Sequence, residues 1–135
     1  MRTTTVLILS LLVLILPACS PQPAGPTEVQ VTLTEFAIES SLTTFQAGVP
    51  YRFVVTNAGA VAHELMITPK SMGGMSMEDM HELALMEIEE EDLPSGATVT
   101  MEFTFPEDAV GSDLEFSCYV PGHYEAGMFL AINVE

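Results

Sequence analysis

Three side chains that bind soft metal ions follow one another at intervals of five residues near the end of the sequence. Cys118 offers a thiolate, His123 an imidazole and Met128 a thioether. A fourth donor, the imidazole of His63, lies far upstream. Two imidazoles and one thiolate, with a weak axial thioether, form the ligand set of blue copper sites. The four residues together therefore predict one mononuclear copper site, although each of them alone would also fit a structural role in a core.

The small number of cysteines excludes several other kinds of site. The chain has two cysteines, and Cys19 lies in an export signal, so Cys118 is left without a partner for a disulfide. A binuclear copper site or a structural zinc site needs more thiolates than this. Multicopper oxidases flank the cysteine with histidines, whereas here the neighbours are Ser117 and Tyr119. A catalytic Cys–His pair needs an open approach to the sulfur, and we expect this loop to enclose it, so an enzyme is not expected.

The segment from Phe116 to Met128 resembles the C-terminal ligand loop of cupredoxins of the plastocyanin and azurin kind. Its Pro-Gly-His-Tyr stretch and its Gly-Met end are similar to those of small bacterial cupredoxins, and Ala62–Leu65 resembles the segment that carries their first histidine. The resemblance implies a Greek-key sandwich with His63, Cys118 and His123 as equatorial copper ligands and Met128 as the axial one. Many cupredoxins have Asn or Asp directly after the first histidine. Here Glu64 stands in that place, which leaves its bracing role open.

The elements that must position these residues read as β-strands. Short runs alternate apolar and polar side chains and are separated by Gly, Pro and Asn, which is typical of strands joined by turns. We expect an all-β sandwich of about seven or eight strands rather than a parallel α/β fold. The clearest candidates are Val29–Leu33, Thr43–Phe45, Tyr51–Val55, Val61–Thr68, Ala97–Phe105, Leu114–Cys118 and Met128–Val134.

Residues 69–92 interrupt this pattern with a segment rich in methionine and acid. We expect an insertion between strands, with a helix over 77–91 capped by Ser76 and Asp79. Clustered thioethers with a nearby imidazole favour Cu(I), so the segment is a candidate for a second, looser copper site. The alternative is that its methionines fill an apolar seam, with Met80 and Met86 in the core. The candidate ligands are Met72, Met75, Met77, Met80 and His81.

The N-terminal residues have the character of an export signal. Arg2 precedes an eleven-residue apolar run, Val6–Leu16, which is too short to span a bilayer. The run ends in Leu-Pro-Ala-Cys, which resembles a bacterial lipobox. We expect residues 1–18 to be a signal peptide, 19–27 a lipidated Cys19 and flexible tether, and 28–135 the cupredoxin domain. An ordinary cleaved secretory peptide is the alternative, and both place the protein outside the cytoplasm, facing the periplasm or the cell exterior.

The charge balance is strongly acidic and restricts the partners. Nineteen carboxylates face three basic side chains, which gives a net charge of −16. Such a surface repels nucleic acid and suits a cationic partner. The acidic run from Glu87 to Asp92 is either a solvated face or a docking patch for a basic cytochrome or oxidase domain. The sequence predicts a membrane-tethered electron carrier, with a copper tolerance or delivery protein as the alternative.

Overall fold

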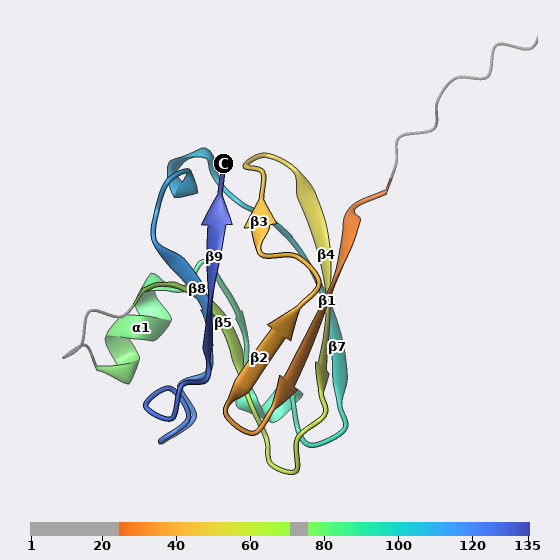
Figure 1. The fold of residues 1–135 in the computed structure, drawn as a ribbon, viewed down its shortest axis with the longest axis vertical. Helices are drawn as coiled ribbons and strands as arrows, with labels where there is room; N and C mark the ends of the chain where they lie inside the picture. Colours follow the sequence, from red (N-terminus) through yellow and green to blue (C-terminus); the bar gives the residue numbers. More distant parts are fainter. Residues whose placement is uncertain (1–24, 71–75) are drawn as a thin grey trace, which may run out of the picture.

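A computed structural model describes residues 25–70 and 76–135 of the chain. The expected signal peptide, Cys19, most of the tether, Met72 and Met75 lie outside these described residues. The described part forms two sheets that pack face to face (Figure 1). The strands are β1 (Thr27–Thr34), β2 (Ala37–Ser40), β3 (Thr44–Phe45), β4 (Pro50–Asn57), β5 (Leu65–Pro69), β6 (Met86–Ile88), β7 (Thr98–Thr104), β8 (Leu114–Ser117) and β9 (Phe129–Val134).

The order of the strands is that of a mixed two-layer sandwich. One sheet has the order β2-β1-β4-β7, and the other has the order β3-β9-β8-β5-β6. Strands β1 and β4 are parallel neighbours although β2 and β3 separate them in the sequence, and β3 pairs in parallel with β9. The predicted all-β sandwich is therefore confirmed, with nine strands in the described residues rather than seven or eight.

The core between the sheets is aromatic at its centre. Phe45 is fully buried and stacks on Phe105 with ring centroids 4.7 Å apart. Its edge contacts reach Tyr51 at 5.1 Å and Phe116 at 6.0 Å, so one ring touches both sheets. Aromatic pairs in such edge and offset arrangements contribute beyond the area they bury. This cluster fixes the spacing of the sheets on which the loops at either end depend.

The strands in the N-terminal half differ from the prediction in two places. The strand expected over Val61–Thr68 begins only at Leu65, so His63 lies in a loop and not in a strand. The cause is Asn57, whose side-chain amide donates to the carbonyls of Val61 and Leu93. These hydrogen bonds hold the segment before Leu65 as a loop, so it does not pair with a neighbouring strand. Strand β2 was not expected from the sequence. It forms because Ala37–Ser40 pairs with the end of β1 across a tight turn.

The insertion contains a helix, but a much shorter one than the predicted span of 77–91. Helix α1 covers Met77–Leu83, and β6 and the 3₁₀ turn η1 (Glu90–Asp92) follow it. The helix stops because the backbone N–H of Leu85 donates to the Ile67 carbonyl, after which Met86 pairs with Ile67 at the sheet edge. The segment therefore adds a strand to the sandwich. A second 3₁₀ turn, η2 (Glu107–Ala109), lies between β7 and β8.

The predicted cap of this helix is confirmed. Ser76 accepts from the backbone of Asp79, and the Asp79 carboxylate accepts from the backbone of Ser76. Met80 and Met86 are 2% and 5% exposed, as the core alternative expected. Within residues 25–70 and 76–135, no helix combines the length and the apolar character needed to cross a bilayer.

Candidate metal centre

Three loops meet at the end of the sandwich opposite the C-terminus (Figure 1). They are the β1–β2 turn, the β4–β5 loop with His63, and the β8–β9 loop with Cys118 and His123. The ring of Phe36 in the first turn and the ring of His123 in the third loop are nearly perpendicular, with ring centroids 5.5 Å apart. Residues far apart in the sequence are thus brought together at one end of the fold.

The donor atoms of His63, Cys118 and His123 converge. All three lie within 4.8 Å of one another. The Nδ1 atoms of the two histidines are 3.2 Å apart, and Cys118 Sγ lies 3.5 Å from His123 Nδ1. Two imidazole nitrogens and a sulfur that face one common point form a set of soft and borderline donors, and such a set suits a copper or zinc ion. The residues present therefore fit a metal ion on their donor chemistry.

The position of His63 is fixed by a fully buried scaffold. Its backbone N–H donates to the Leu93 carbonyl, to which the Asn57 amide also donates. Its Nε2 atom is buried and has no hydrogen-bond partner among the described residues. Gly59 lies so close to this ring that an added Cβ would be 2.8 Å from Nε2. The backbone around His63 therefore holds the ring with its Nδ1 edge toward Cys118 and His123.

The β8–β9 loop is tied to itself by backbone hydrogen bonds. The N–H of Cys118 donates to the Met128 carbonyl, and the N–H of Met128 donates to the His123 carbonyl. Gly122 and Gly127 have φ of 85° and 103°, a region that favours glycine and permits the two sharp reversals. Cys118 and Met128 are fully buried, whereas His123 is half-buried. This loop thus carries three of the four predicted ligands on a backbone held by its own hydrogen bonds, and His63 lies on the β4–β5 loop beside it.

Glu64 braces this loop from the neighbouring one. Its Oε1 atom accepts a hydrogen bond of 2.6 Å from the backbone N–H of Tyr119, the residue after Cys118. Glu64 is only 6% exposed, so the bond joins the two ligand-bearing loops inside the protein. The sequence left the role of this carboxylate open. In the structure it joins the loops and does not extend into solvent.

Burial shifts the proton affinities of the donors in opposite directions. Desolvation raises the pKa of the Cys118 thiol, with smaller opposing effects from backbone hydrogen bonds of Glu64 and Val120. Desolvation, and then the nearby His123, lower the pKa of His63. The imidazole therefore stays neutral and keeps a lone pair for a cation, while the thiolate needs a positive charge beside it to form.

Three residues of this end were not singled out by the sequence. Asn57 and Gly59 shape the pocket of His63, and the sequence marked them only as residue types that are common between strands. Phe36 is 49% exposed, has φ of 63° and lies with its ring nearly perpendicular to that of His123. Its position follows from the left-handed backbone of the β1–β2 turn, which sequence pattern alone does not reveal.

The candidate ligands of the second copper site are not brought together as one group in the described part. Met80 is 2% exposed and packs against Met66 and Tyr119 in a small separate cluster. His81 is exposed, and its Nδ1 contacts Glu87 Oε1 at 2.5 Å. Met72 and Met75 lie outside the described residues. The structure thus gives Met80 a packing role and His81 a carboxylate neighbour.

Comparison with known proteins relates the chain to copper proteins. No protein-family model matches it. It is 30% identical over 89 residues to the "Copper-resistant cuproprotein CopI" of Vibrio cholerae, a match that covers 62% of this chain and 49% of the relative. The chain thus spans about half the length of that curated protein.

Solved structures share the fold at low identity. An auracyanin of Roseiflexus castenholzii matches with a TM-score of 0.60 and 20% identity over 83% of this chain and 98% of its own. Auracyanin A of Chloroflexus aurantiacus, described as a blue copper protein, matches with a TM-score of 0.61 and 23% identity. That match covers 82% of this chain and all of the auracyanin.

Proposed function

We propose that this chain, which has the cupredoxin fold, is a type 1 copper protein that transfers single electrons outside the cytoplasm. His63, Cys118 and His123 would be the equatorial ligands and Met128 the axial one, with one copper ion per chain. The observation that carries the proposal is the convergence of three donor atoms within 4.8 Å at the loop end of the sandwich. An electron-transfer role, and not a catalytic one, agrees with a sulfur that is buried and enclosed by its own loop.

The residues around the donors suit an ion that changes its charge by one unit. Bound copper would supply the one-electron redox chemistry. The chain itself supplies two imidazoles of unlike exposure, a buried sulfur and the Glu64–Tyr119 bond that ties the loops together. Donors held by such a scaffold move little when the charge at the centre changes, and outer partners of ligands influence the redox potential.

The first experiment is to add Cu(II) to the protein and record its visible spectrum, EPR spectrum and copper content together. We expect an intense thiolate-to-copper band and one copper per chain. Cys118→Ser should abolish the band. The matched control is Cys19→Ser, which removes the other cysteine and should leave the band unchanged. A correctly folded protein that takes up copper without colour would contradict the proposal.

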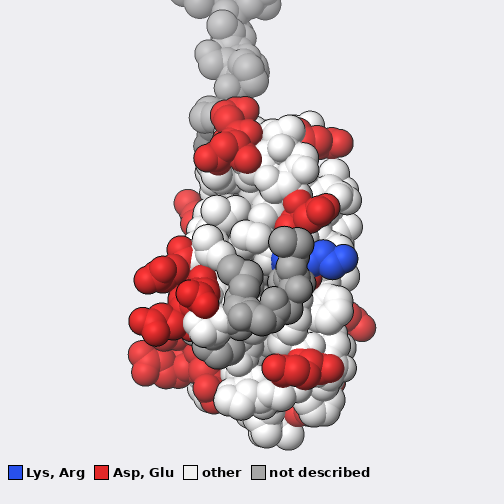
Figure 2. Space-filling model, turned by 90° about the vertical axis from the view of Figure 1, so that its left-hand side faces the viewer, with Lys and Arg blue, Asp and Glu red and all other residues white. Residues whose placement is uncertain are grey.

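We propose a basic redox partner, such as a cytochrome or an oxidase domain. Acidic side chains gather along one edge of the molecule in Figure 2, whereas basic side chains occupy only a small area of this face. The run from Glu89 to Asp92 is exposed and lies close to the end that carries the donors. Long-range attraction toward a cationic surface would raise the rate of encounter.

We further propose that Cys19 is lipidated after removal of residues 1–18, which would tether the protein to a bacterial membrane. The proposal rests on the apolar run and the Leu-Pro-Ala-Cys sequence that ends it. In cells, the wild-type protein should sediment with membranes, and Cys19→Ser should move it to the soluble fraction. Wild-type protein found in the soluble fraction would support the alternative of an ordinary secretory peptide, and a variant that stays with the membranes would contradict lipidation at Cys19.

A copper tolerance or delivery role is the second candidate, and the similarity to the copper-resistant protein CopI favours it. It would use the methionine-rich segment as a second Cu(I) site. Because Met80 is buried in a packing cluster, its substitution would test stability and not metal binding. The informative variant changes Met72, Met75 and Met77 to Leu. Delivery predicts fewer Cu(I) bound per chain and slower transfer to an acceptor, and unchanged values would exclude it.

A further inference from the structure

We propose that Glu64, His81 and Glu87 form a second metal site, which takes a divalent transition ion such as Zn²⁺. The site is separate from the thiolate centre in its donors and contains none of the four predicted copper ligands. Because Glu64 also accepts a hydrogen bond from the Tyr119 backbone, an ion bound there would also influence the loop that carries Cys118.

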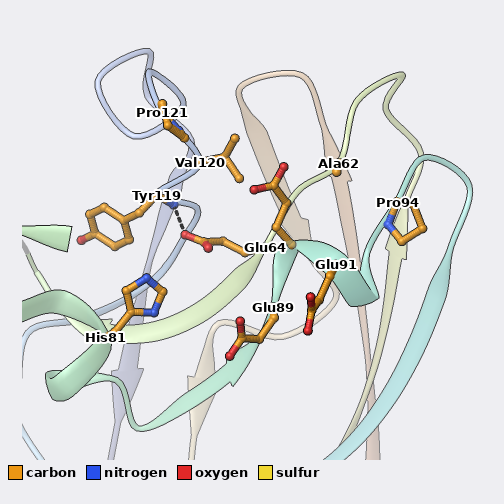
Figure 3. Close-up of a pocket in the computed structure, with 10 residues that line it drawn as sticks. Ala62, Glu64, His81, Glu89, Glu91, Pro94, Tyr119, Val120 and Pro121 are labelled. Atoms are coloured by element: carbon orange, nitrogen blue, oxygen red, sulfur yellow. Dashed lines mark hydrogen bonds between the residues drawn. The ribbon is translucent and has the colours of Figure 1, made fainter. Parts of the chain in front are cut away.

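The donor atoms of these three residues already converge. One ligand atom from each lies within 4.8 Å of the other two. His81 Nδ1 and Glu87 Oε1 are in contact at 2.5 Å. Glu64 is more than nine-tenths buried, and within the described residues its only hydrogen bond is the one that Oε1 accepts from Tyr119. Its carboxylate lies between the Tyr119 backbone and the His81 ring (Figure 3), so the same carboxylate that joins the loops also faces the imidazole.

Three different elements hold these side chains in place. Glu64 directly precedes β5, His81 lies in the last turn of α1, and Glu87 is the central residue of β6. Strand β6 pairs with β5 so that Glu87 is opposite Met66, and the backbone bond from Leu85 to Ile67 fixes the end of the helix. The insertion therefore brings the imidazole and the second carboxylate to a buried carboxylate of the sandwich.

The surroundings favour a cation. Glu64 and His81 line a surface pocket of about 570 Å³, and three further carboxylates, Glu89, Glu90 and Glu91, line it as well. Among the ten residues that line this pocket there is no Lys or Arg. A hollow lined by one sign of charge concentrates ions of the opposite sign.

The donor types decide which ion the site would take. Two carboxylates and an imidazole are hard and borderline donors, which suit Zn²⁺ and other divalent ions and not Cu(I). The site therefore differs from a methionine-rich Cu(I) site, which needs thioethers. It also differs from the thiolate centre, since it contains no sulfur.

The test is Zn²⁺ titration by calorimetry in the Cys118→Ser background, which removes the thiolate. We expect one Zn²⁺ per chain, with binding weakened at least tenfold by His81→Ala or by Glu87→Gln. The matched control is Glu91→Gln, which removes one negative charge, as Glu87→Gln does, from the pocket that Glu64 and His81 line, but removes no proposed ligand. It should change the affinity less than twofold. Equal weakening by Glu87→Gln and Glu91→Gln would show diffuse attraction and overturn the site, as would the absence of zinc binding.

A second measurement uses the wild-type protein loaded with one equivalent of Cu(II), because an excess of Cu(II) would itself bind to carboxylate and imidazole donors. Zn²⁺ should shift its thiolate-to-copper band through Glu64 and the Tyr119 backbone, and Glu87→Gln should remove this response. Copper loading with no band would contradict the proposed function alone, because the zinc titration does not require copper. An intact band with no zinc bound would overturn only the second site.

Discussion

At the level of single residues, Gly59 determines how closely the backbone can approach His63. A Cβ at position 59 would lie 2.8 Å from His63 Nε2 and 2.9 Å from a Glu35 carboxylate oxygen. We predict that Gly59→Ala displaces the His63 ring and weakens copper binding by about 10- to 100-fold, which is the usual effect of changing an outer partner of a metal ligand. The measurement is copper affinity by competition with a chelator of known strength.

The control for this prediction is Gly25→Ala. An added Cβ at Gly25 meets nothing within 4 Å, so copper affinity should stay at the wild-type value. Equal affinities for the Gly59 variant and the wild type would mean that His63 can move aside without loss. The rigid scaffold around its ring would then be unimportant for binding.

The donors at this scale could be predicted from the sequence, whereas their supports could not. Cysteine and histidine are rare in this chain, so their spacing carries a strong signal even without a structure. Asn57 is an ordinary polar residue, and its contact with Leu93 joins positions 36 residues apart. Such a bond has no local signature, because it depends on how β4 and the η1 turn are packed together. Glu64 was notable in the sequence only because many cupredoxins have Asn or Asp directly after the first histidine.

Among the elements, helix α1 depends on a reciprocal cap between Ser76 and Asp79. Hydrogen bonds from the Ser76 side chain and backbone lower the pKa of Asp79 below its usual value of 3.8. Because the pKa of Asp79 is lowered, the stabilisation by the cap is fully present at a pH above 3.8. It is lost as the pH falls through the lowered pKa of Asp79. We predict that the Ser76 amide signal in NMR follows this transition, and that Asp79→Asn removes it.

The elements themselves were predictable to different degrees. The alternation of side chains over 97–105 predicted β7 nearly to its ends, because the strand alternates regularly between exposed and half-buried residues. Helix α1 was predicted too long, since the acidic residues after it suit a helix locally. The competing interaction is the pairing of Met86 with Ile67 in β5, which comes from a distant part of the chain. Local preference is weak compared with a position at the edge of a sheet.

Strand β3 has only two residues, yet it carries the ring at the centre of the core. Phe45 is fully buried and contacts Tyr51 in one sheet and Phe116 in the other. We predict that Phe45→Ala lowers the free energy of unfolding by about 3–5 kcal/mol, measured by urea denaturation of the metal-free protein. The comparison is Phe129→Ala, which removes a ring that is 42% exposed. A similar loss at both positions would contradict the central role of Phe45.

For the molecule as a whole, the charge of −16 should govern the rate of electron exchange with charged reagents. We predict that reduction by a small cationic complex slows as salt is added, since screening weakens the attraction. Reduction by a small anionic complex should become faster under the same conditions. Stopped-flow kinetics over a range of salt concentrations tests both. Equal salt dependence for the two reagents would mean that the acidic surface does not affect the approach of a charged reagent to the place where the electron is exchanged.

The direction of β1 has a consequence for how a tethered protein would stand on a membrane. The strand begins at Thr27, and the turn that follows its last residue carries Phe36, whose ring touches His123. Eight residues of strand span about 26 Å, so the donors lie a full strand length from the point where the chain enters the sandwich. A lipid at Cys19 would thus hold the protein by its far end. The metal centre would face outward, toward proteins that approach from the aqueous side rather than toward groups embedded in the bilayer.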